Sequence, residues 1–503
     1  MIQLIPPEDV ISISKWIPIT KAYKYEMETT KNQEVKLNQT LGTCRHLYND
    51  SLSERKKGYE NGGWNVQYND QQNYLPILRN KKDETGKYLQ EVYAQVLQDV
   101  MRRVDTSYKN FFRRIKNNKN NGNDGKKEKV GFPRFKGYGR YDSFTFPQYG
   151  NGADIRIYKN KNKNSKHTIR LSKIGEIKYI SHREIGEFKN RETKKIEKIP
   201  YQIKTITIKK EVDKWFVVAT VDTFVEIINP TIPNQITSIE ELNSKCVGID
   251  MGLFNLASIS TRNNIEPQKY LRKSEKRLAK EQRKLSKKQK YEKIVEINKL
   301  ISKGLKIDNE IERKKIKVNS KNREKQIIKV KKVHRKIVNQ RRNFNHEVSR
   351  TLTDNFDLIV FEKLNIQKMM QNHHYAKSIA DASWYQIQMF TKYKAEWAGK
   401  MVDFVDPKDT TKQCSKCGKI NDMPIWKRTM ECSCGNIEDR DIDASFVIRD
   451  RSTIYQDLKK KVIDRANKPV GTQYPDFKPL ERMTSTQSNE QVNSRNKETK
   501  QGR

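Results

Sequence analysis

The sequence predicts an α+β multidomain protein, because helical and strand patterns occupy separate stretches of the 503-residue chain. Apolar residues recur at helical spacing within residues 30–130, whereas short runs of β-branched and aromatic residues fill residues 131–225. A Pro- and Asn-rich linker is expected within residues 226–244. Beyond it, short apolar runs alternate with long charged segments of helical period. A chain of this length has room for about two to four domains.

The N-terminal part is predicted to contain one strand and two main helices. Residues 17–27 have the pattern of a strand. The apolar face of the first helix is formed by Leu37, Leu41, Cys44, Tyr48 and Leu52. The apolar face of the second is formed by Val92, Val96, Val100, Val104, Phe111 and Ile115. These two faces predict a small helical bundle.

The region that follows the helices is predicted to be rich in β-structure. The runs 205–208 and 215–218 flank a polar turn and predict a hairpin. Near the start of the region, basic residues such as Arg134 and Lys136 interleave with aromatic residues. This pattern suits the stacking of unpaired bases and contacts to phosphates, although aromatic residues in a β region also form ordinary cores.

A long basic segment, residues 270–343, is predicted to form two long helices. Its helical period is set by Leu271, Leu278 and Leu285, and then by Ile294, Ile297 and Ile301. Gly304 and the polar residues after it would permit a bend. The cationic excess favours a nucleic-acid channel over a solvated coiled coil that only spaces the fold. The candidate phosphate contacts are Lys287, Lys288, Arg341 and Arg342.

Three acidic residues, Asp250, Glu362 and Asp441, are the candidates for catalysis. CVGI leads into Asp250 and LIVF leads into Glu362, so both carboxylates are expected at the ends of short buried strands. Asp441 lies in DRDIDAS, where a polar turn begins. Carboxylates gathered at a sheet edge would suit two Mg²⁺ ions about 3.5–4 Å apart, because hard cations prefer oxygen ligands. This arrangement is expected of an RNase H-like core that cleaves phosphodiesters.

Each acidic motif also has a simpler interpretation. The strand–Asp–turn pattern of GIDMG also opens actin-like ATPase domains, and Asp after a strand is often only a turn former. Asp441 lies beside Asp439 and Asp443, so an ordinary acidic cluster at a helix N-terminus is an alternative. The order of the three motifs, with a cysteine cluster between the last two, favours metal binding.

Four of the six cysteines lie in the window 410–437. Cys414 and Cys417 form a CxxC pair followed by glycine, and Cys432 and Cys434 form a tighter CxC pair. Thiolates at these spacings can surround one tetrahedral Zn²⁺ ion, so a structural zinc ribbon is predicted rather than disulfides.

Three other residues with reactive side chains are predicted to pack rather than to react. Cys44 and Cys246 lie in apolar helix and strand patterns and are expected in the core. His346 lies in a helical pattern and is expected to be a packing residue.

The charge balance indicates a nucleic-acid partner. Lysine and arginine number 102 against 61 aspartate and glutamate, which gives a formal net charge of +41. Such an excess attracts phosphates and releases counterions on binding. An AT-biased genome would raise the lysine count, but it would not explain why acidic residues fail to balance it. No apolar run approaches the length of a membrane span and no secretory signal is recognisable, so a cytoplasmic protein without a membrane partner is expected.

The residues from Asp403 onward, DFVDPKDTTKQCSKCG and then ECSCGNIEDRDIDASFVI, resemble the C-terminal half of TnpB proteins. These are transposon-encoded RNA-guided DNA nucleases, and the compact type V-F CRISPR effectors are their relatives. Upstream, NQEVKLNQTLGTCRHLYN, GFPRFKGYGRYDSFTFP, KTITIKKEVDKWFV and NQRRNFNHEVSRTL also resemble segments of the family. Agreement across many ordered segments, from about residue 20 to residue 450, is more specific than any single motif.

The resemblance implies a domain organisation. Residues 1–29 would supply an N-terminal segment and the first strand of a β-rich wedge domain, whose main part is residues 131–225. Residues 30–130 would be a helical recognition domain. Residues 245–460 would be an RNase H-like (RuvC) nuclease domain that contains the basic helical hairpin and the zinc ribbon. Residues 461–503 would be a disordered tail.

The resemblance also implies a function, an RNA-guided DNA endonuclease that cuts after guide pairing and recognition of a short flanking motif. Asp250, Glu362 and Asp441 would hold two Mg²⁺ ions, and the four cysteines would hold structural Zn²⁺. Guide RNA and target DNA would be the partners, in a prokaryotic cytoplasm and at the nucleoid when bound to DNA. A monomer and a homodimer both stay open.

Two other functions stay open beside it: an RNA-guided repressor that binds DNA without cutting, and a DNA-binding transposase that needs no RNA. The presence of all three carboxylates argues against the repressor. The motifs do not separate a transposon protein from a CRISPR effector, because both share them.

The sequence departs from the family at its third acidic motif, which usually reads D-x-N-A-A. Here Asp443 replaces the usual Asn and Ser445 replaces an Ala. Asp441 keeps the metal carboxylate, and Asp443 is expected to add a negative charge beside it.

Overall fold

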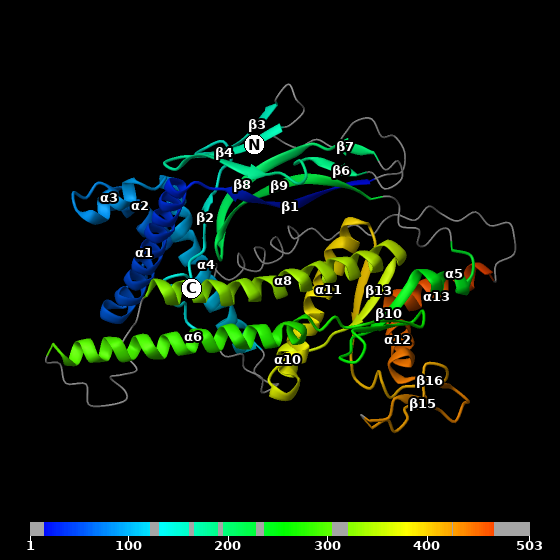
Figure 1. Cartoon of the computed structure of the whole chain (residues 1–503). Coiled ribbons are helices and arrows are strands. Elements are labelled where there is room, and N and C mark those ends of the chain that lie inside the picture. The colour runs from blue at the N-terminus through cyan, green and yellow to red at the C-terminus, as the bar shows by residue number, and fades with distance from the viewer. Residues whose placement is uncertain are drawn as a thin grey trace, which may run out of the picture.

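The computed structural model describes residues 15–120, 130–159, 165–189, 195–227, 236–303, 320–424 and 426–466. Its mixed α and β composition confirms the class expected from the sequence. Figure 1 shows a large sheet, a long helical hairpin beneath it, and a second sheet that carries a small two-stranded loop region. The predicted linker core at 228–235, the bend at Gly304 and most of the predicted tail lie outside the described residues.

The large sheet has seven strands in the order β2-β8-β9-β1-β5-β4-β3, and all its neighbours are antiparallel. Its strands are β1 (Lys15–Glu28), β2 (Ser143–Phe146), β3 (Ala153–Lys159), β4 (Ser165–Leu171), β5 (Gly175–Ile180), β8 (Tyr201–Glu211) and β9 (Lys214–Ile227). A separate pair is formed by β6 (Glu187–Lys189) and β7 (Ile196–Lys198). The predicted strand at 17–27 and the predicted hairpin are confirmed as β1 and as β8–β9. Strand β1 pairs with β9 along most of its length and with β5 on its other side, so the N-terminal strand is the middle strand of a sheet that is otherwise formed much later in the chain.

The helical part contains α1 (Lys31–Gly62), α2 (Tyr68–Arg79), α3 (Glu84–Gln90) and α4 (Ala94–Asn120). Thr30 begins α1 with a capping box, in which its side chain accepts from the Gln33 amide and the Gln33 side chain accepts in return. The buried face of α1 is the one expected, and Cys44 is fully buried. Of the face expected for the second helix, the four valines are buried, with Val92 just before α4, whereas Phe111 and Ile115 are half-buried. The helices and the large sheet share one continuous apolar core.

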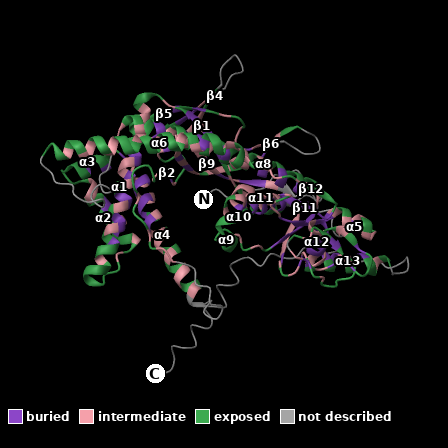
Figure 2. Ribbon diagram, turned by 60° about the horizontal axis from the view of Figure 1, so that its bottom comes forward, coloured by how far each residue is buried: buried purple, intermediate pink, exposed green. Residues whose placement is uncertain are grey.

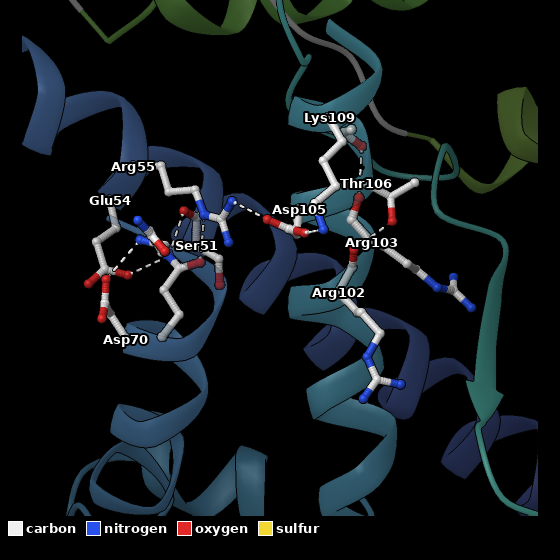
Figure 3. A network of polar contacts seen from close by, with 12 residues as sticks. Ser51, Glu54, Arg55, Asp70, Arg102, Arg103, Asp105, Thr106 and Lys109 are labelled. Atoms are coloured by element: carbon white, nitrogen blue, oxygen red, sulfur yellow. Dashed lines mark hydrogen bonds and ion pairs between the residues drawn. The ribbon is translucent and has the colours of Figure 1, made fainter. Parts of the chain in front are cut away.

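A polar network ties α1 to its neighbours within this core. Arg55 of α1 donates to Asp105 of α4 at 3.2 Å and to the Gln71 side chain of α2 at 2.9 Å. Figure 3 shows the Arg55 guanidinium turned toward Asp105 across the gap between the two helices. Because Arg55 is buried, this pairing satisfies a charge that would otherwise be costly to place there.

The second sheet has five strands in the order β12-β11-β10-β13-β14. They are β10 (Cys246–Asp250), β11 (Ala257–Ile259), β12 (Asn263–Ile265), β13 (Leu358–Glu362) and β14 (Met401–Val405). Strands β10, β13 and β14 are parallel, and β11 and β12 are antiparallel additions at one edge. The two apolar runs predicted as buried strands are therefore central neighbours.

Helices cover both faces of this sheet, so alternate residues of each central strand enter different cores. Val247 and Ile359 pack with α8 and α11, whereas Cys246 and Leu358 pack with α12 and α13. The helices around the sheet are α5 (Ile239–Lys245), α9 (Ile366–Met369), α10 (His373–Ala382), α11 (Trp384–Trp397), α12 (Arg440–Asp450) and α13 (Thr453–Ala466). Figure 2 shows the buried residues concentrated where these helices meet the strands.

The long basic segment forms the predicted pair of helices, α6 (Tyr270–Ile301) and α8 (Lys321–Asn355). Their apolar seam is short and consists of Leu278, Val333 and Ile337 at the base of the hairpin. Helix α8 also reaches the large sheet, because Lys332 and Arg335 pair with Asp213 in the β8–β9 turn at 2.6 and 3.0 Å. The hairpin therefore joins the two lobes.

Two boundaries differ from the sequence prediction. Residues 239–244 of the expected linker form most of α5, whose Leu242 is fully buried. Residues 461–466 of the expected tail complete α13, where Val462 packs into the core beside α5. In both cases one or two apolar residues anchor a mostly polar segment, a signal too weak to read from composition.

Candidate acidic site and cysteine cluster

Asp250 and Glu362 end the two central parallel strands of the five-stranded sheet. Ile249 lies opposite Phe361 in the register, so the next residue of each strand is one of the two acids. The carboxyl ends of parallel strands lie at the same sheet edge, which brings these residues together from 112 positions apart. Both are buried, with 8% of Asp250 and 5% of Glu362 exposed.

Asp441 reaches the same region from a helix rather than from a strand. It lies in the first turn of α12, whose N-cap is Asp439. Helix α12 packs directly on β10, and a Cβ at Gly248 would meet the Ser445 carbonyl oxygen at 2.0 Å. Glycine is therefore required at position 248 for the helix to approach the strand. The acidic cluster at the N-terminus of α12 therefore lies close enough to Asp250 to act on it electrostatically.

The three carboxylates act on one another electrostatically. Burial and the negative charges of Glu362 and Asp441 raise the pKa of Asp250 well above its ordinary value, while Arg440 opposes this shift. Burial also raises the pKa of Glu362, against a hydrogen bond from the Thr410 hydroxyl and the charge of Arg451. A bound divalent cation would add positive charge beside these carboxylates and would lower their pKa instead of raising it.

Two arginines partly neutralise the third carboxylate. Asp441 accepts from Arg440 Nη2 at 2.9 Å and from Arg428 Nη1 at 3.3 Å. Within the described ranges, no acidic trio brings its oxygens within 4.8 Å of one another. The three carboxylates therefore share one buried region but are less tightly gathered than the cysteines.

The four cysteines form a cluster that could hold a metal ion. Their sulfur atoms all lie within 4.8 Å of one another, with Cys414 and Cys434 at 3.7 Å and Cys417 and Cys432 at 3.5 Å. Four thiolates about 2.3 Å from one tetrahedral zinc ion would lie about 3.8 Å apart, close to these separations. The window contains the two-stranded pair β15 (Thr429–Glu431) and β16 (Ile437–Asp439).

Local turns account for the tight CxC spacing and for the chemistry of its first thiol. The Cys432 amide donates to the Asn436 carbonyl at 2.9 Å, and Gly435 between them has a φ of 81°, which favours glycine. The backbone N–H of Cys434, with help from the neighbouring thiols and Asn421, lowers the pKa of Cys432 to about 6. A thiolate is the form that binds metal.

Asp443 does not lie beside Asp441 as a second charge, so that expectation is wrong. Its side chain is fully buried and turned toward the cysteine loop. It accepts from the Ser415 amide at 3.2 Å, the Ser415 hydroxyl at 2.5 Å and Asn436 Nδ2 at 2.7 Å. Asn436 Nδ2 also lies 3.5 Å from Cys414 Sγ. Residues two positions apart on a helix point in different directions. Asp441 and Asp443 of α12 therefore face different neighbours.

The candidate phosphate contacts fall into two groups. Arg134, Lys287 and Arg342 are exposed, and Lys136 and Lys288 are half-buried. Arg341 differs from the expectation, because its Nη2 donates to the largely buried carboxylate of Asp381 at 2.9 Å. This arginine is held within the fold rather than offered on its surface.

Sequence reasoning missed several residues that support the site. Thr410 is 48 positions from Glu362 and Arg428 is 13 positions from Asp441, and no motif in the sequence marks either residue as a partner of these carboxylates. Arg440 and Asn436 lie next to recognised motifs. Their positions in the sequence therefore indicated that they belong to the site, but not which residues they contact. His346 stacks on Phe390 with ring centroids 4.1 Å apart, in agreement with the packing role expected for it.

Three family profiles match successive parts of the chain. A "Helix-turn-helix domain" profile from OrfB of IS605 elements matches residues 19–63, and a "Probable transposase" profile of the same OrfB matches residues 232–373. A "Cas12f1-like, TNB domain" profile matches residues 384–448, which include all four clustered cysteines and Asp441. The chain resembles the TnpB proteins.

Full-length relatives agree with the profiles. The chain is 24% identical over 413 residues to "Putative RNA-guided DNA endonuclease InsQ" of Escherichia coli K12, covering 79% of this chain and 83% of that protein. It is 26% identical over 431 residues to a "Putative RNA-guided DNA endonuclease" of Streptomyces pristinaespiralis, covering 85% and 88%. A shorter match, 31% over 165 residues, is to "TnpB-like protein L79" of a mimivirus and covers 31% of this chain and 29% of that protein.

Among solved structures, the chain is similar to a Cas12f1–sgRNA–target DNA complex with a TM-score of 0.46 and 15% identity. That match covers 86% of this TnpB-like chain and 99% of the other. No helix within the described residues is both long and apolar enough to cross a membrane.

Proposed function

We propose that this chain is an RNA-guided DNA endonuclease whose active site is formed by Asp250, Glu362 and Asp441. The observation that carries the proposal is the meeting of these residues, from three distant motifs, at one end of a central parallel strand pair. Ordinary folding stability does not favour two buried carboxylates with the partly buried carboxylate of Asp441 close enough to raise the pKa of one of them. Relatives named putative RNA-guided DNA endonucleases match 79% and 85% of the chain.

Residues 245–460 are proposed as the RNase H-like (RuvC) nuclease domain. The mixed sheet, with acids at adjacent strand ends and a third on a helix that packs against it, supports this assignment. Two bound Mg²⁺ ions would activate a water and stabilise the leaving 3′ oxygen. The side chains of Asp250 and Glu362 would hold these ions from the strand ends, and Asp441 would do so from α12.

The residues around the carboxylates prepare them for this role. Thr410 fixes one oxygen of Glu362 by donating its hydroxyl hydrogen, which leaves the second oxygen for a ligand. Arg428 and Arg440 offset part of the negative charge at Asp441. These positioning contacts would keep the site intact before metal and substrate arrive.

The cysteine cluster is proposed as a structural Zn²⁺ site. All four donors are thiols, which leaves no open position for a reacting water. The cluster is joined to α12 through Asp443, so it would brace the helix that carries Asp441. Residues 30–130 and 131–225 are proposed to grip guide RNA and the end of the target duplex.

The test is cleavage of a guide-matched DNA by the purified RNA–protein complex in Mg²⁺. Asp250→Ala, Glu362→Ala and Asp441→Ala should each abolish cleavage while guide and target binding stay nearly intact. Asp464→Ala is the matched control, because it removes an exposed carboxylate of α13, which packs on the same five-stranded sheet. Full cutting by any one of the three variants would remove that residue from the site.

Two measurements separate the alternatives. A repressor would bind guide-matched DNA without cutting it in any metal, and a conventional transposase would purify without a defined RNA. Sequencing of the RNA that copurifies with the wild-type chain, combined with the cleavage assay, distinguishes the endonuclease, the repressor and the transposase.

A further inference from the structure

A cavity of about 390 Å³ lies where the base of the helical hairpin meets α10. Its walls come from the start of α6, from α8 near Arg341 and Asn345, from α10 near Tyr375, and from the turn 253–256. Figure 1 shows α6, α8 and α10 converging beside the five-stranded sheet. The turn 253–256 follows Asp250 almost directly, so one wall of the cavity continues from the acidic site.

Two buried polar atoms of the cavity lining have no partner. Asn345 is 1% exposed, and its Oδ1 accepts no hydrogen bond although its Nδ2 donates to Gln386 at 2.7 Å. Arg341 Nε also donates to no acceptor, while Nη2 of the same side chain is held by Asp381. The two residues are one helical turn apart on α8 and share a face. Buried polar groups are normally satisfied, so one unpaired acceptor and one unpaired donor on residues that line the cavity favour a ligand that supplies both a donor and an acceptor.

The remaining lining indicates the chemistry of that ligand. Tyr270 and Phe344 form an edge-to-face pair with centroids 6.3 Å apart, and Tyr375 is 55% exposed. Lys269 and Arg272 add cationic groups. The lining carboxylate, Asp381, is already engaged by Arg341 and by the Leu271 amide at 3.1 Å. A flat ring with donors and acceptors on its edge, joined to a phosphate, fits these features, and single-stranded nucleic acids offer such groups.

The cavity is connected to the proposed active site through Phe254. This residue lines the cavity, and the Arg428 guanidinium lies over its ring at 5.8 Å. The same arginine pairs with Asp441. Trp384 fixes the turn by donating its indole N–H to the Gly252 carbonyl at 3.2 Å.

We propose that this cavity binds the base of one unpaired nucleotide in a DNA strand whose backbone crosses the acidic site. Arg341 and Asn345 contact the edge of the base, and Tyr375 covers its face. The role of the strand as a substrate rests on the proposed function, but occupancy of the cavity by a base does not.

The experiment measures binding of short single-stranded DNA to the full chain loaded with a guide RNA that does not match it. One abasic site is moved along the oligonucleotide in steps of one nucleotide, without added Mg²⁺. Because stacking of one base contributes substantially to single-strand binding, one position should weaken affinity roughly ten-fold. An affinity that does not depend on the abasic position would overturn the proposal.

Matched tyrosine variants locate the effect. Tyr375→Ala should weaken binding of the intact oligonucleotide and remove the dependence on abasic position. Tyr385→Ala removes an equally exposed tyrosine on α11 that does not line the cavity, and it should leave the profile unchanged. Identical profiles for the two variants would place the base elsewhere.

Asn345→Leu tests ligand binding and folding together. It removes the unpaired acceptor and also the bond that Asn345 Nδ2 donates to Gln386, so the abasic profile should flatten and the melting temperature should fall. A shifted melting temperature with an unchanged profile would make Asn345 a purely structural residue and contradict the proposal. Asp250→Ala should keep the profile while cleavage is lost, so failure of the cavity and failure of the nuclease assignment give different results.

Discussion

At the scale of single residues, Asp443 shows how two positions on one helix can serve different parts of a site. Asp441 faces the acidic region, whereas Asp443 accepts three hydrogen bonds from the cysteine loop. Its carboxylate therefore links the helix that carries one proposed metal ligand to the proposed zinc site. Groups that orient ligating residues commonly tune a metal site in this way.

Asp443→Asn should lower stability and zinc retention, although Asn is the usual residue of the family at this position. An amide has one acceptor oxygen, so its NH₂ would face either Ser415 or Asn436, both of which donate. Loss of one buried acceptor costs about 1–3 kcal/mol. Thermal melting and zinc analysis of the purified variant check this. A melting temperature and zinc content equal to the wild type would show that the loop re-pairs without loss.

His346 should make stability fall in mildly acidic solution. Burial, with the charges of Lys394 and Arg342, lowers its pKa from 6.5 to about 4. The folded state therefore disfavours the imidazolium, and this contribution to stability is present above pH 6.5 and is lost as the pH falls toward 4. Denaturant midpoints between these pH values should decline more steeply for the wild type than for His346→Phe. Equal slopes for the two proteins would contradict the assignment.

At the scale of elements, the basic hairpin is a short apolar seam with a long charged extension. Leu278, Val333 and Ile337 hold its base, whereas Tyr291 and Ile294 further along α6 are exposed. The cations of the extension are consequently available to phosphates, whereas Arg341 at the base of the hairpin is held by Asp381.

Lys287→Ala combined with Arg342→Ala should weaken nucleic-acid binding with little dependence on sequence. Each lost phosphate contact flattens the log K against log salt slope by about 0.9 for duplex DNA, and the direction is the same for a guide–target hybrid. Lys377→Ala is the control, because its Nζ is already paired with Glu275 on α6. An unchanged slope with unchanged affinity in the double variant would favour a hairpin that only spaces the fold.

The cysteine loop should depend on its metal for folding. Cys414→Ser should reduce zinc content and thermal stability together, since a structural zinc ion can contribute roughly 10 kcal/mol or more to a small site. Cys246→Ala is the control, because this buried cysteine lies in the sheet core and its loss should leave zinc content unchanged. Absence of zinc from the wild-type protein would end this interpretation.

At the scale of the whole molecule, two sheets with separate cores are joined by the helical hairpin. The joint includes the Asp213 pairs and Lys21 of β1 over the Trp397 ring of α11 at 5.2 Å. The lobe built on the five-stranded sheet contains an unfavourable feature, the buried carboxylates of Asp250 and Glu362. A feature that costs stability and persists is expected at a functional site.

Asp250→Asn should raise the melting temperature of the metal-free protein and remove the increase caused by Mg²⁺. Neutralising Asp250 relieves its burial cost and its repulsion with Glu362 and Asp441. Scanning calorimetry with and without Mg²⁺, compared with Asp464→Asn, measures both effects. A variant that is still stabilised by Mg²⁺ to the wild-type extent would show that the ions bind elsewhere.

The sequence by itself determined the local elements and the identity of the chemical groups. Apolar runs marked β10 and β13, helical spacing marked α1, α4, α6 and α8, and the cysteine spacings marked a four-thiol cluster. Each of these signals is periodic or compact, so neighbouring residues are enough to specify it. The acidic motifs were recognisable for the same reason, since each follows directly from a local pattern.

Only the tertiary structure decided which groups meet. The register of β10 with β13 places Asp250 beside Glu362, and the packing of α12 on Gly248 brings Asp441 toward them. The same packing turns Asp443 to the cysteines, and the hairpin base commits Arg341 to Asp381. These partners are separated by tens to hundreds of residues. Their pairing depends on side-chain direction and close packing across the whole fold, which no local pattern encodes.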